Sequence, residues 1–299
     1  MIKQPPYLKK GDKIAIVCPA KKLPKKIDYA ISLLESWGLE VIIGDSVYAS
    51  HHQFAGTDEL RTKDIQRFLD DNGVRAIICG RGGYGAIRII DQLDFTAFTE
   101  NPKWFVGFSD VTVLLSHIIA KTQTPCIHGQ MPYTFEDSTE AAITSLKNSL
   151  FGALQSYSYA STFTNRTGEA SGILIGGNLT LLTMLQGSAS EMNFDDKILF
   201  LEDVGEQEYS IDRMLRMLKR AGKLKNLRGL IIGAFNEIAE EKISFGQTAE
   251  EVIREIVKDY KYPVCFNFPC GHIENNLSMV LGAEVALTVE KNNVQFIYL

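Results

Sequence analysis

The 299-residue sequence contains few cysteines, no long apolar run and no block of like charge. Its five cysteines are odd in number and scattered, mostly within apolar segments, which favours reduced, buried thiols over a disulfide framework. No stretch approaches the roughly 20 apolar residues that a membrane-spanning helix requires. The lysine-containing N-terminus has no apolar core of signal-peptide length. We therefore expect a cytoplasmic protein that is not associated with a membrane.

Two further absences narrow the range of partners. The net charge of −5 argues against a surface that binds nucleic acid. The sequence has no histidine pair with the spacing of a zinc protease, no paired cysteine ligands and no carboxylate cluster that would suggest a metal. We expect an enzyme that uses neither a metal nor another cofactor.

What the sequence does contain is an alternation of strand and helix patterns from residue 13 to about residue 127, which predicts a parallel sheet covered on both faces. The polar segment at residues 155–162 has no helical period and indicates an exposed strand or a linker. The second half then has strands and helices of its own. The sequence predicts an α/β fold, with an N-terminal parallel-sheet α/β domain (residues 1–155) and a smaller C-terminal α/β domain rich in β-strand (residues 156–299).

Two turns stand out in the first half, at residues 80–85 and 107–110. Each follows a short apolar run typical of a buried strand, and each precedes a helical pattern, which after the first turn covers residues 86–93. Such turns meet at one edge of a parallel sheet, where ligands bind. The first turn is rich in glycine and backbone N–H groups, and the second carries the hydroxyl of Ser109. A nucleophile and an oxyanion hole require this layout.

Each turn also has a second interpretation. Gly80, Gly82 and Gly85 satisfy the dinucleotide-binding pattern G-x-G-x-x-G, with Asp110 roughly where a ribose-binding carboxylate would stand. A nucleotide-binding protein without catalytic activity is therefore an alternative. Ser109 matches the nucleophile pattern G-x-S-x-G only in part, so it could instead cap the following helix.

A nucleophilic serine needs a base, and the base needs an acid that orients it. Of the five histidines, His128 and His272 both follow strand ends, and the sequence leaves them as rivals. Glu202 and Asp203 end a buried strand with their side chains on opposite faces. Because a buried carboxylate is costly unless it is paired, we expect one of the two to meet a histidine or an arginine.

Ten segments, in order and at similar spacing over nearly the whole chain, resemble the serine LD-carboxypeptidases, a family that includes the microcin C immunity peptidases. The segments are KGDKIAIV (10–17), FAGTDELR (54–61), RGGYG (81–85), GFSD (107–110), HG (128–129), GGNL (176–179), LEDV (201–204), YSIDRML (209–215), GH (271–272) and NN (275–276). The resemblance implies a nucleophile at Ser109, an acid at Glu202 and a general base at His272. With one residue in the first half and two in the second, the site would lie at the domain interface.

The resemblance also implies an oxyanion hole and a substrate. The oxyanion donors would be backbone N–H groups of Gly82 or Gly83 and of Asp110. The substrate would be a cytoplasmic muropeptide tetrapeptide that loses its terminal D-alanine during peptidoglycan recycling. A homodimer is implied as well.

For substrate binding, the sequence offers Arg81, which can hold a terminal carboxylate in a bidentate manner, and His128. Pairing of Arg81 with Asp110 or with another acid is the structural alternative. The rival branch of the family cleaves aminoacyl-nucleotide amides and would need an aromatic platform. Neither Trp37, in an early helix, nor Trp104, in a buried strand, is an obvious platform, so the muropeptide is favoured.

Overall fold

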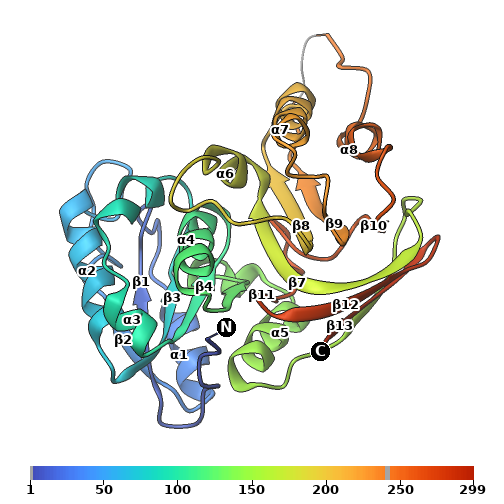
Figure 1. Ribbon diagram of the computed structural model, residues 1–299. Coiled ribbons are helices and arrows are strands. Elements are labelled where there is room, and N and C mark those ends of the chain that lie inside the picture. Colours follow the sequence, from blue (N-terminus) through green and yellow to red (C-terminus); the bar gives the residue numbers. More distant parts are fainter. Residues whose placement is uncertain (1–2, 240–242) are drawn as a thin grey trace.

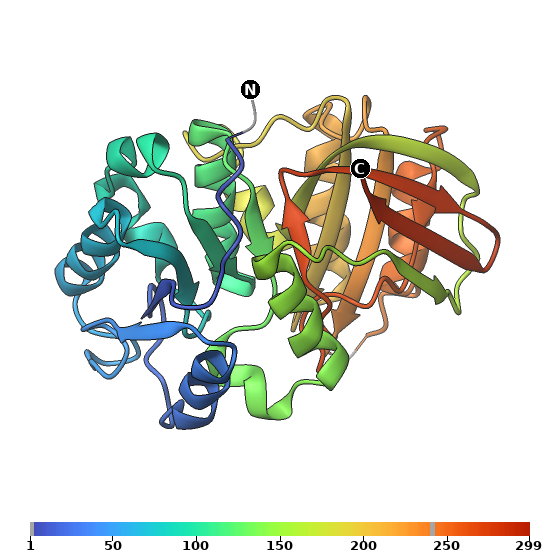
Figure 2. The ribbon, with the colours of Figure 1, turned by 90° about the horizontal axis from the view of Figure 1, so that it is seen from below.

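The structure is a computed structural model that describes residues 3–239 and 243–299. It is an α/β protein with two sheets. Figures 1 and 2 show the two sheets side by side, the first in the blue-to-green half of the chain and the second in the yellow-to-red half. We call the first sheet with the helices that cover it the first lobe, and the second sheet with its helices the second lobe.

The first sheet has six strands in the order β11-β5-β4-β3-β1-β2. All neighbours are parallel except β11, which is antiparallel to β5 and comes from the second half of the chain. A strand from the second half of the chain thus completes the first sheet. The domain boundary predicted at residue 155 stays a prediction. The strands are β1 (Lys13–Val17), β2 (Glu40–Ile43), β3 (Val74–Cys79), β4 (Trp104–Gly107), β5 (Cys126–His128) and β11 (Met279–Leu281).

The second sheet has seven strands in the order β10-β9-β8-β7-β12-β13-β6. The four strands from β10 to β7 are parallel, and the remaining pairs are antiparallel. The strands are β6 (Tyr157–Ala160), β7 (Gly168–Asn178), β8 (Lys197–Val204), β9 (Gly229–Asn236), β10 (Val264–Cys265), β12 (Glu284–Val289) and β13 (Asn293–Tyr298).

The helices cover the sheets, and within the described residues none is long and apolar enough to cross a membrane. Helices α7 and α8 lie together over the second sheet (Figure 1), and their apolar residues form one buried cluster with those of β8 and β9. The helices are α1 (Asp28–Ser36), α2 (Asp58–Asp70), α3 (Thr96–Glu100), α4 (Thr112–Thr122), α5 (Glu140–Phe151), α6 (Leu179–Met184), α7 (Glu208–Arg220) and α8 (Ala249–Val257).

The helix predicted for residues 86–93 is wrong. Two short 3₁₀ turns, Ala86–Arg88 and Ile90–Gln92, occupy this segment. The segment is too short for an α-helix to be stable by itself, and three of its eight residues are β-branched isoleucines, which lower helix propensity. The two 3₁₀ turns pack against α4 instead.

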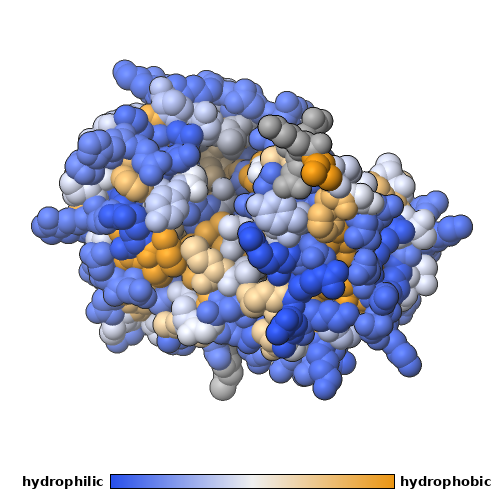
Figure 3. All heavy atoms as spheres, turned by 90° about the horizontal axis from the view of Figure 1, so that it is seen from above, coloured by the Kyte–Doolittle hydropathy of each residue, from blue (hydrophilic) through white to orange (hydrophobic). Residues whose placement is uncertain are grey.

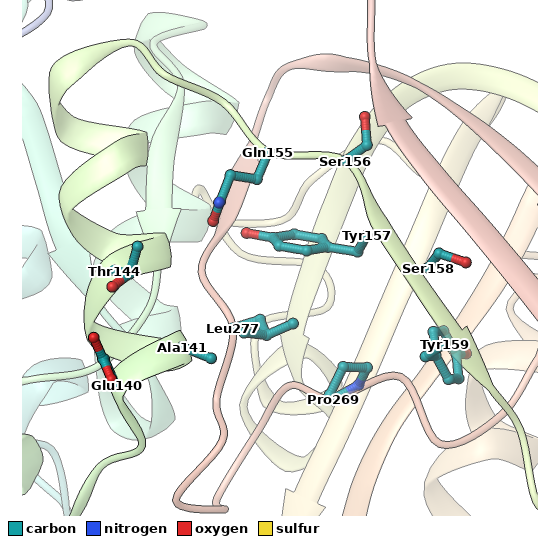
Figure 4. A pocket seen from close by; sticks show the side chains of 10 residues that line it. All are labelled: Glu140, Ala141, Thr144, Gln155, Ser156, Tyr157, Ser158, Tyr159, Pro269 and Leu277. Atoms are coloured by element: carbon teal, nitrogen blue, oxygen red, sulfur yellow. The ribbon is translucent and has the colours of Figure 1, made fainter.

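The polar segment at residues 155–162 contains β6, which forms one edge of the second sheet. Its side chains alternate, with Tyr157 buried and Ser158 exposed. Between β6 and α5 lies a groove of about 500 Å³, shown in Figure 4. Tyr157 extends into this groove from β6, and its hydroxyl donates to the carbonyl oxygen of Ser278 at 2.8 Å. The strand interpretation of this segment is thus confirmed.

The apolar core is continuous between the lobes. One buried cluster contains Val17, Ile77 and Phe108 of the first lobe together with Phe200 and Phe268 of the second. A second cluster lies under α7 and α8, and a third lies on the other face of the first sheet, under α1 and α5. Because the largest cluster spans both lobes, the hydrophobic effect fixes their relative position.

Gly176 and Gly177, at the end of β7, make this close junction possible. A Cβ atom at Gly177 would lie 2.8 Å from a methyl carbon of Thr112, at the start of α4. A Cβ atom at Gly176 would lie 2.0 Å from the carbonyl oxygen of Phe200 on β8. Both glycines also have φ angles, +144° and +137°, that disfavour other residues.

We expect Gly176→Ala to lower the free energy of unfolding by about 3 kcal/mol, because overpacking adds to backbone strain. Gly187→Ala is the matched control: Gly187 has a φ of +79°, and nothing lies within 4 Å of its would-be Cβ atom. This control should cost about 1 kcal/mol, from strain alone. Urea denaturation measures both values. Equal losses would mean that the contact with Phe200 does not limit the packing of β7 on β8.

Candidate active site

Ser109 lies in a sharp turn between β4 and α4. Its φ is +63°, in the left-handed region that residues other than glycine rarely adopt. The helical turns after it begin without a side-chain cap, so the alternative that Ser109 caps a helix is wrong. A serine held in this conformation after a strand has the geometry of an elbow nucleophile.

The glycine turn lies directly against Ser109. A Cβ atom at Gly82 would lie 3.0 Å from the Cβ atom and 3.3 Å from the Oγ atom of Ser109, so a side chain here would crowd the serine. The next residue, Gly83, has a φ of +113° and lies under the side-chain stem of Lys21. Within the described part of the chain, no acceptor is paired with the backbone N–H groups of Gly82, Gly83 or Asp110. These are the donors predicted for the oxyanion hole.

Glu202 and His272 form a buried pair. His272 Nδ1 lies 2.7 Å from Glu202 Oε2, and the carboxylate of Glu202 is fully buried. Burial by itself lowers the pKa of His272, but the negative charge of Glu202 and this hydrogen bond outweigh it, so the pKa is raised. The expectation that one carboxylate of this strand end meets a histidine is confirmed.

Asp203 lies on the opposite face of β8 and has a different role. Its carboxylate accepts from the side chain of Asn178 at 2.8 Å and from the backbone N–H and hydroxyl of Thr180 at 3.0 and 2.9 Å. Asn178 in turn caps α6, because its side chain accepts from the backbone N–H of Leu181. Asp203 therefore fixes the start of α6 rather than the histidine.

The loop that carries His272 is held at several points that the sequence did not single out by role. Asn236 donates to the carbonyl oxygen of His272 at 2.8 Å, and the fully buried Asn276 accepts from the N–H of Gly271 at 2.8 Å. Gln130 of the first lobe donates to the carbonyl oxygens of Ile273 and Glu274. The available signal was the Asn275-Asn276 pair within the matching segments.

Gly271 is required because its backbone passes close to Glu202. A Cβ atom at this position would lie 3.0 Å from the Cβ and 3.1 Å from Oε2 of Glu202, and its φ is +122°. The glycine thus lets the loop bring His272 down onto the carboxylate.

His128 is the histidine that the structure separates from the base. It is fully buried, and neither ring nitrogen has a hydrogen-bond partner among the described residues. Burial lowers its pKa to about 4. Its ring lies against those of Phe108 and Phe200 at 5.7 and 5.1 Å. A fully buried ring has no surface that a substrate could contact. His128 therefore packs behind the site and does not bind the substrate directly.

The two halves of the site meet at Phe108. This residue precedes Ser109, and its ring lies 5.0 Å from that of His272. A cavity of about 240 Å³ opens beside these two rings and is lined by Phe108, Gln130, Thr134, Asp137, Ser138, His272, Ile273 and Glu274. On the face of the molecule in Figure 3, hydrophilic side chains dominate the periphery and apolar ones gather toward the middle.

Arg81 does not pair with Asp110. Its guanidinium donates to the carbonyl oxygen of Lys22 at 2.7 Å and lies 4.8 Å from the centre of the Tyr133 ring. The carboxylate of Asp110 instead accepts from the backbone N–H of Ala86 at 2.8 Å. Arg81 forms no ion pair with any other acid in the described part of the chain either, so the structural alternative is wrong. Its contact with a substrate stays a prediction.

Comparison with known proteins gives consistent matches. Residues 14–129 match the model for the LD-carboxypeptidase N-terminal domain, and residues 171–287 match that for the C-terminal domain. A probable murein peptide carboxypeptidase of Bacillus subtilis is 34% identical over 97% of this chain and 93% of its own length. The microcin C7 self-immunity protein MccF of Escherichia coli is 25% identical over 88% of this chain and 86% of its own.

Among solved structures, muramoyltetrapeptide carboxypeptidase from Oxalobacter formigenes superposes with a TM-score of 0.87. It is 28% identical, and the match covers 96% of this chain and 98% of the other. The similarity therefore extends over both lobes and their mutual arrangement.

The hydrogen bond between Glu202 and His272 predicts that the pKa of His272 depends on the carboxylate of Glu202. Glu202→Gln should lower the pKa of His272, because the charge and the hydrogen bond that most oppose the effect of burial are then lost, and only the weaker effects of Asp203 and Glu237 remain. NMR titration of the histidine ring protons, assigned with His272→Asn, measures this shift. Glu59→Gln, on an exposed residue, is the control and should leave the pKa unchanged.

The same pair affects stability in a defined direction. Because the folded-state pKa of His272 is raised, its protonation stabilises the fold fully below the unfolded pKa, and this contribution is lost as pH rises through the folded pKa. This gain in stability toward acidic pH should be smaller in Glu202→Gln, because the folded-state pKa of His272 is lower there. A His272 pKa that is the same with and without the carboxylate would contradict the pairing.

Proposed function

The chain belongs to the LD-carboxypeptidase family, and we propose that it is a serine peptidase that releases the terminal D-alanine from cytoplasmic muropeptide tetrapeptides in peptidoglycan recycling. Membership in this family supports a peptidase hydrolase with carboxypeptidase activity. The observation that carries the finer proposal is the buried Glu202–His272 hydrogen bond beside the strained turn of Ser109.

The first chemical step follows from the order of these groups. Nδ1 of His272 is engaged by Glu202, which leaves Nε2 to accept the proton of Ser109 as the serine attacks the carbonyl carbon. Glu202 fixes the tautomer and stabilises the imidazolium that forms. The imidazolium then donates its proton to the leaving amino group of D-alanine, and the C–N bond breaks.

The second step returns the enzyme to its starting state. A water molecule gives its proton to His272 and attacks the acyl-serine, and the shortened peptide leaves as Ser109 recovers its proton. In both steps the backbone N–H groups of Gly82 or Gly83 and of Asp110 would stabilise the negative oxygen. One such donor contributes about 3–4 kcal/mol in related chemistry.

Two observations bear on the choice of substrate. The MccF relative is named for immunity to microcin C7, which makes an aminoacyl-nucleotide amide the alternative substrate. Such a ligand would need an aromatic surface for its base. Trp37 and Trp104 are buried, at 6% and 0% exposure, whereas Tyr84 of the glycine turn is 45% exposed. The preference for the muropeptide therefore rests on the relative named a murein peptide carboxypeptidase, at 34% identity. A homodimer in the cytoplasm is proposed from the family resemblance.

The proposal predicts that Ser109→Ala abolishes alanine release from a murein tetrapeptide, by about 10⁴-fold or more, since the nucleophile is lost. The melting temperature should stay near wild type. Mass spectrometry of the products, without added metal or nucleotide, measures the activity. Ser116→Ala, on α4, the helix that follows the turn of Ser109, is the control and should stay active, because Ser116 has no hydrogen-bond partner among the described residues. An active Ser109→Ala enzyme would refute the mechanism.

A second prediction concerns the terminal carboxylate. Arg81 makes one hydrogen bond within the described residues, and an arginine has five N–H donors, so it can still hold a carboxylate. Arg81→Gln should raise KM for the tetrapeptide roughly 10- to 100-fold. Wild type should cleave a tetrapeptide with an amidated terminus poorly, and Arg81→Gln should change the KM for this amidated peptide little.

Arg75→Gln, on an exposed position of β3, is the matched control and should behave as wild type. Equal catalytic efficiency of the wild-type enzyme on the free and the amidated tetrapeptide would refute both the anchor at Arg81 and the carboxypeptidase specificity. Cleavage of an aminoacyl-nucleotide amide in preference to the tetrapeptide would favour the alternative substrate.

A further inference from the structure

Arg61, on α2, is a fully buried arginine outside the proposed triad. Its guanidinium donates to the carbonyl oxygens of Pro19 and Gly85 and to the carboxylate of Asp58. It also lies 5.0 Å from the centre of the Phe54 ring. A buried charge is costly unless its partners satisfy it. Two of the three partners of this cation are backbone carbonyls of loops, so its hydrogen bonds position the chain.

One peptide unit links Arg61 to the residue after Ser109. The carbonyl oxygen of Gly85 accepts from Arg61 at 3.0 Å, and the N–H of the same peptide unit, on Ala86, donates to the carboxylate of Asp110 at 2.8 Å. Asp110 is 1% exposed. The positive guanidinium therefore stands at the negative end of the peptide dipole, and the carboxylate stands at its positive end. This arrangement ties the glycine turn to the serine turn.

The other carbonyl groups of the glycine turn are held in the same way. The N–H of Lys21 donates to the carbonyl oxygen of Gly82 at 3.3 Å, and the N–H of Tyr133 donates to that of Gly80 at 3.0 Å. With Gly80, Gly82 and Gly85 engaged through their oxygens, the backbone N–H groups of Gly82 and Gly83 remain without an acceptor among the described residues. Of these contacts, only the one at Gly85 comes from a charged side chain.

We propose that Arg61 is a positioning residue for the oxyanion hole. By holding the Gly85–Ala86 peptide against Asp110, it sets the spacing between the N–H groups of the glycine turn and the N–H of Asp110. This inference rests on the proposed function, because the hole has a role only if Ser109 is acylated. Asp58 orients Arg61 and is itself held by Arg88, whose Nε and Nη2 both donate to it at 2.6–3.1 Å.

A role in the oxyanion hole differs measurably from a role in stability. The hole is used in the transition state and not in the ground state, so its distortion lowers kcat without a matching rise in KM. Arg61→Lys keeps the positive charge but loses the forked geometry. We expect kcat to fall about 100- to 1000-fold, as when one oxyanion donor is lost, while KM stays within about threefold of wild type.

The control is Arg67→Lys, on the same helix, where the arginine is half exposed and pairs with Asp64. It should keep wild-type kcat and KM. If Arg61→Lys does not fold, Asp58→Asn is the second variant, because it removes the carboxylate that orients Arg61 and leaves the guanidinium in place. It should show the same selective loss of kcat to a smaller degree.

A p-nitrophenyl ester separates this inference from the choice of substrate. Acylation of Ser109 by the ester needs the oxyanion hole but no muropeptide, so it should slow in Arg61→Lys as kcat does. If wild type cleaves the ester at Ser109 but not the tetrapeptide, the proposed substrate is wrong and the ester rates still test Arg61. A folded Arg61→Lys or Asp58→Asn enzyme with wild-type kcat, or with a raised KM alone, would overturn the inference. So would a wild-type Ser109 that reacts with neither compound.

Discussion

The contact of four rings between the lobes is the interaction on which the site depends. Phe108 and His128 come from the first lobe, and Phe200 and His272 come from the second, with centroids 5.0–5.7 Å apart where they meet. These rings belong to or adjoin a core that both lobes share. Because Ser109 follows Phe108, a shift of one lobe against the other would separate the serine from the histidine. Close packing in this interface resists such a shift.

Around this contact the protein buries several charges and gives each a distinct partner. Glu202 is hydrogen-bonded to His272, Asp203 accepts from the backbone N–H at the start of α6, and Asp110 accepts from the backbone N–H that follows the glycine turn. The two terminal nitrogens of Arg61 donate to carbonyl oxygens and to Asp58, while its Nε has no partner among the described residues. Removing one member of such a set leaves a buried charge without compensation, which costs more than the contact contributes. The local backbone is therefore held in one arrangement, including the left-handed conformation of Ser109.

Several features were predictable from the sequence because they arise from local periodicity. The short apolar run before the glycine turn indicated the strand that is β3 in the structure. The opposite directions of Glu202 and Asp203 follow from the period of two in a strand. The order of the ten matching segments indicated the family, which the comparisons bear out. The helix predicted at residues 86–93 failed because its isoleucines fit a helical period while contacts outside the segment imposed 3₁₀ turns.

The sequence by itself determined the α/β class, the two turns at one sheet edge and the candidates for the site, since each depends on residues close together in the chain. The family resemblance indicated His272 as the base, and the tertiary structure shows its hydrogen bond with Glu202. Only the tertiary structure decided that the carboxylate of Asp110 accepts from the N–H of Ala86 instead of pairing with Arg81, and that β11 returns to the first sheet. Those outcomes join residues far apart in sequence. The packing of the shared core selects among partners that local patterns leave equivalent.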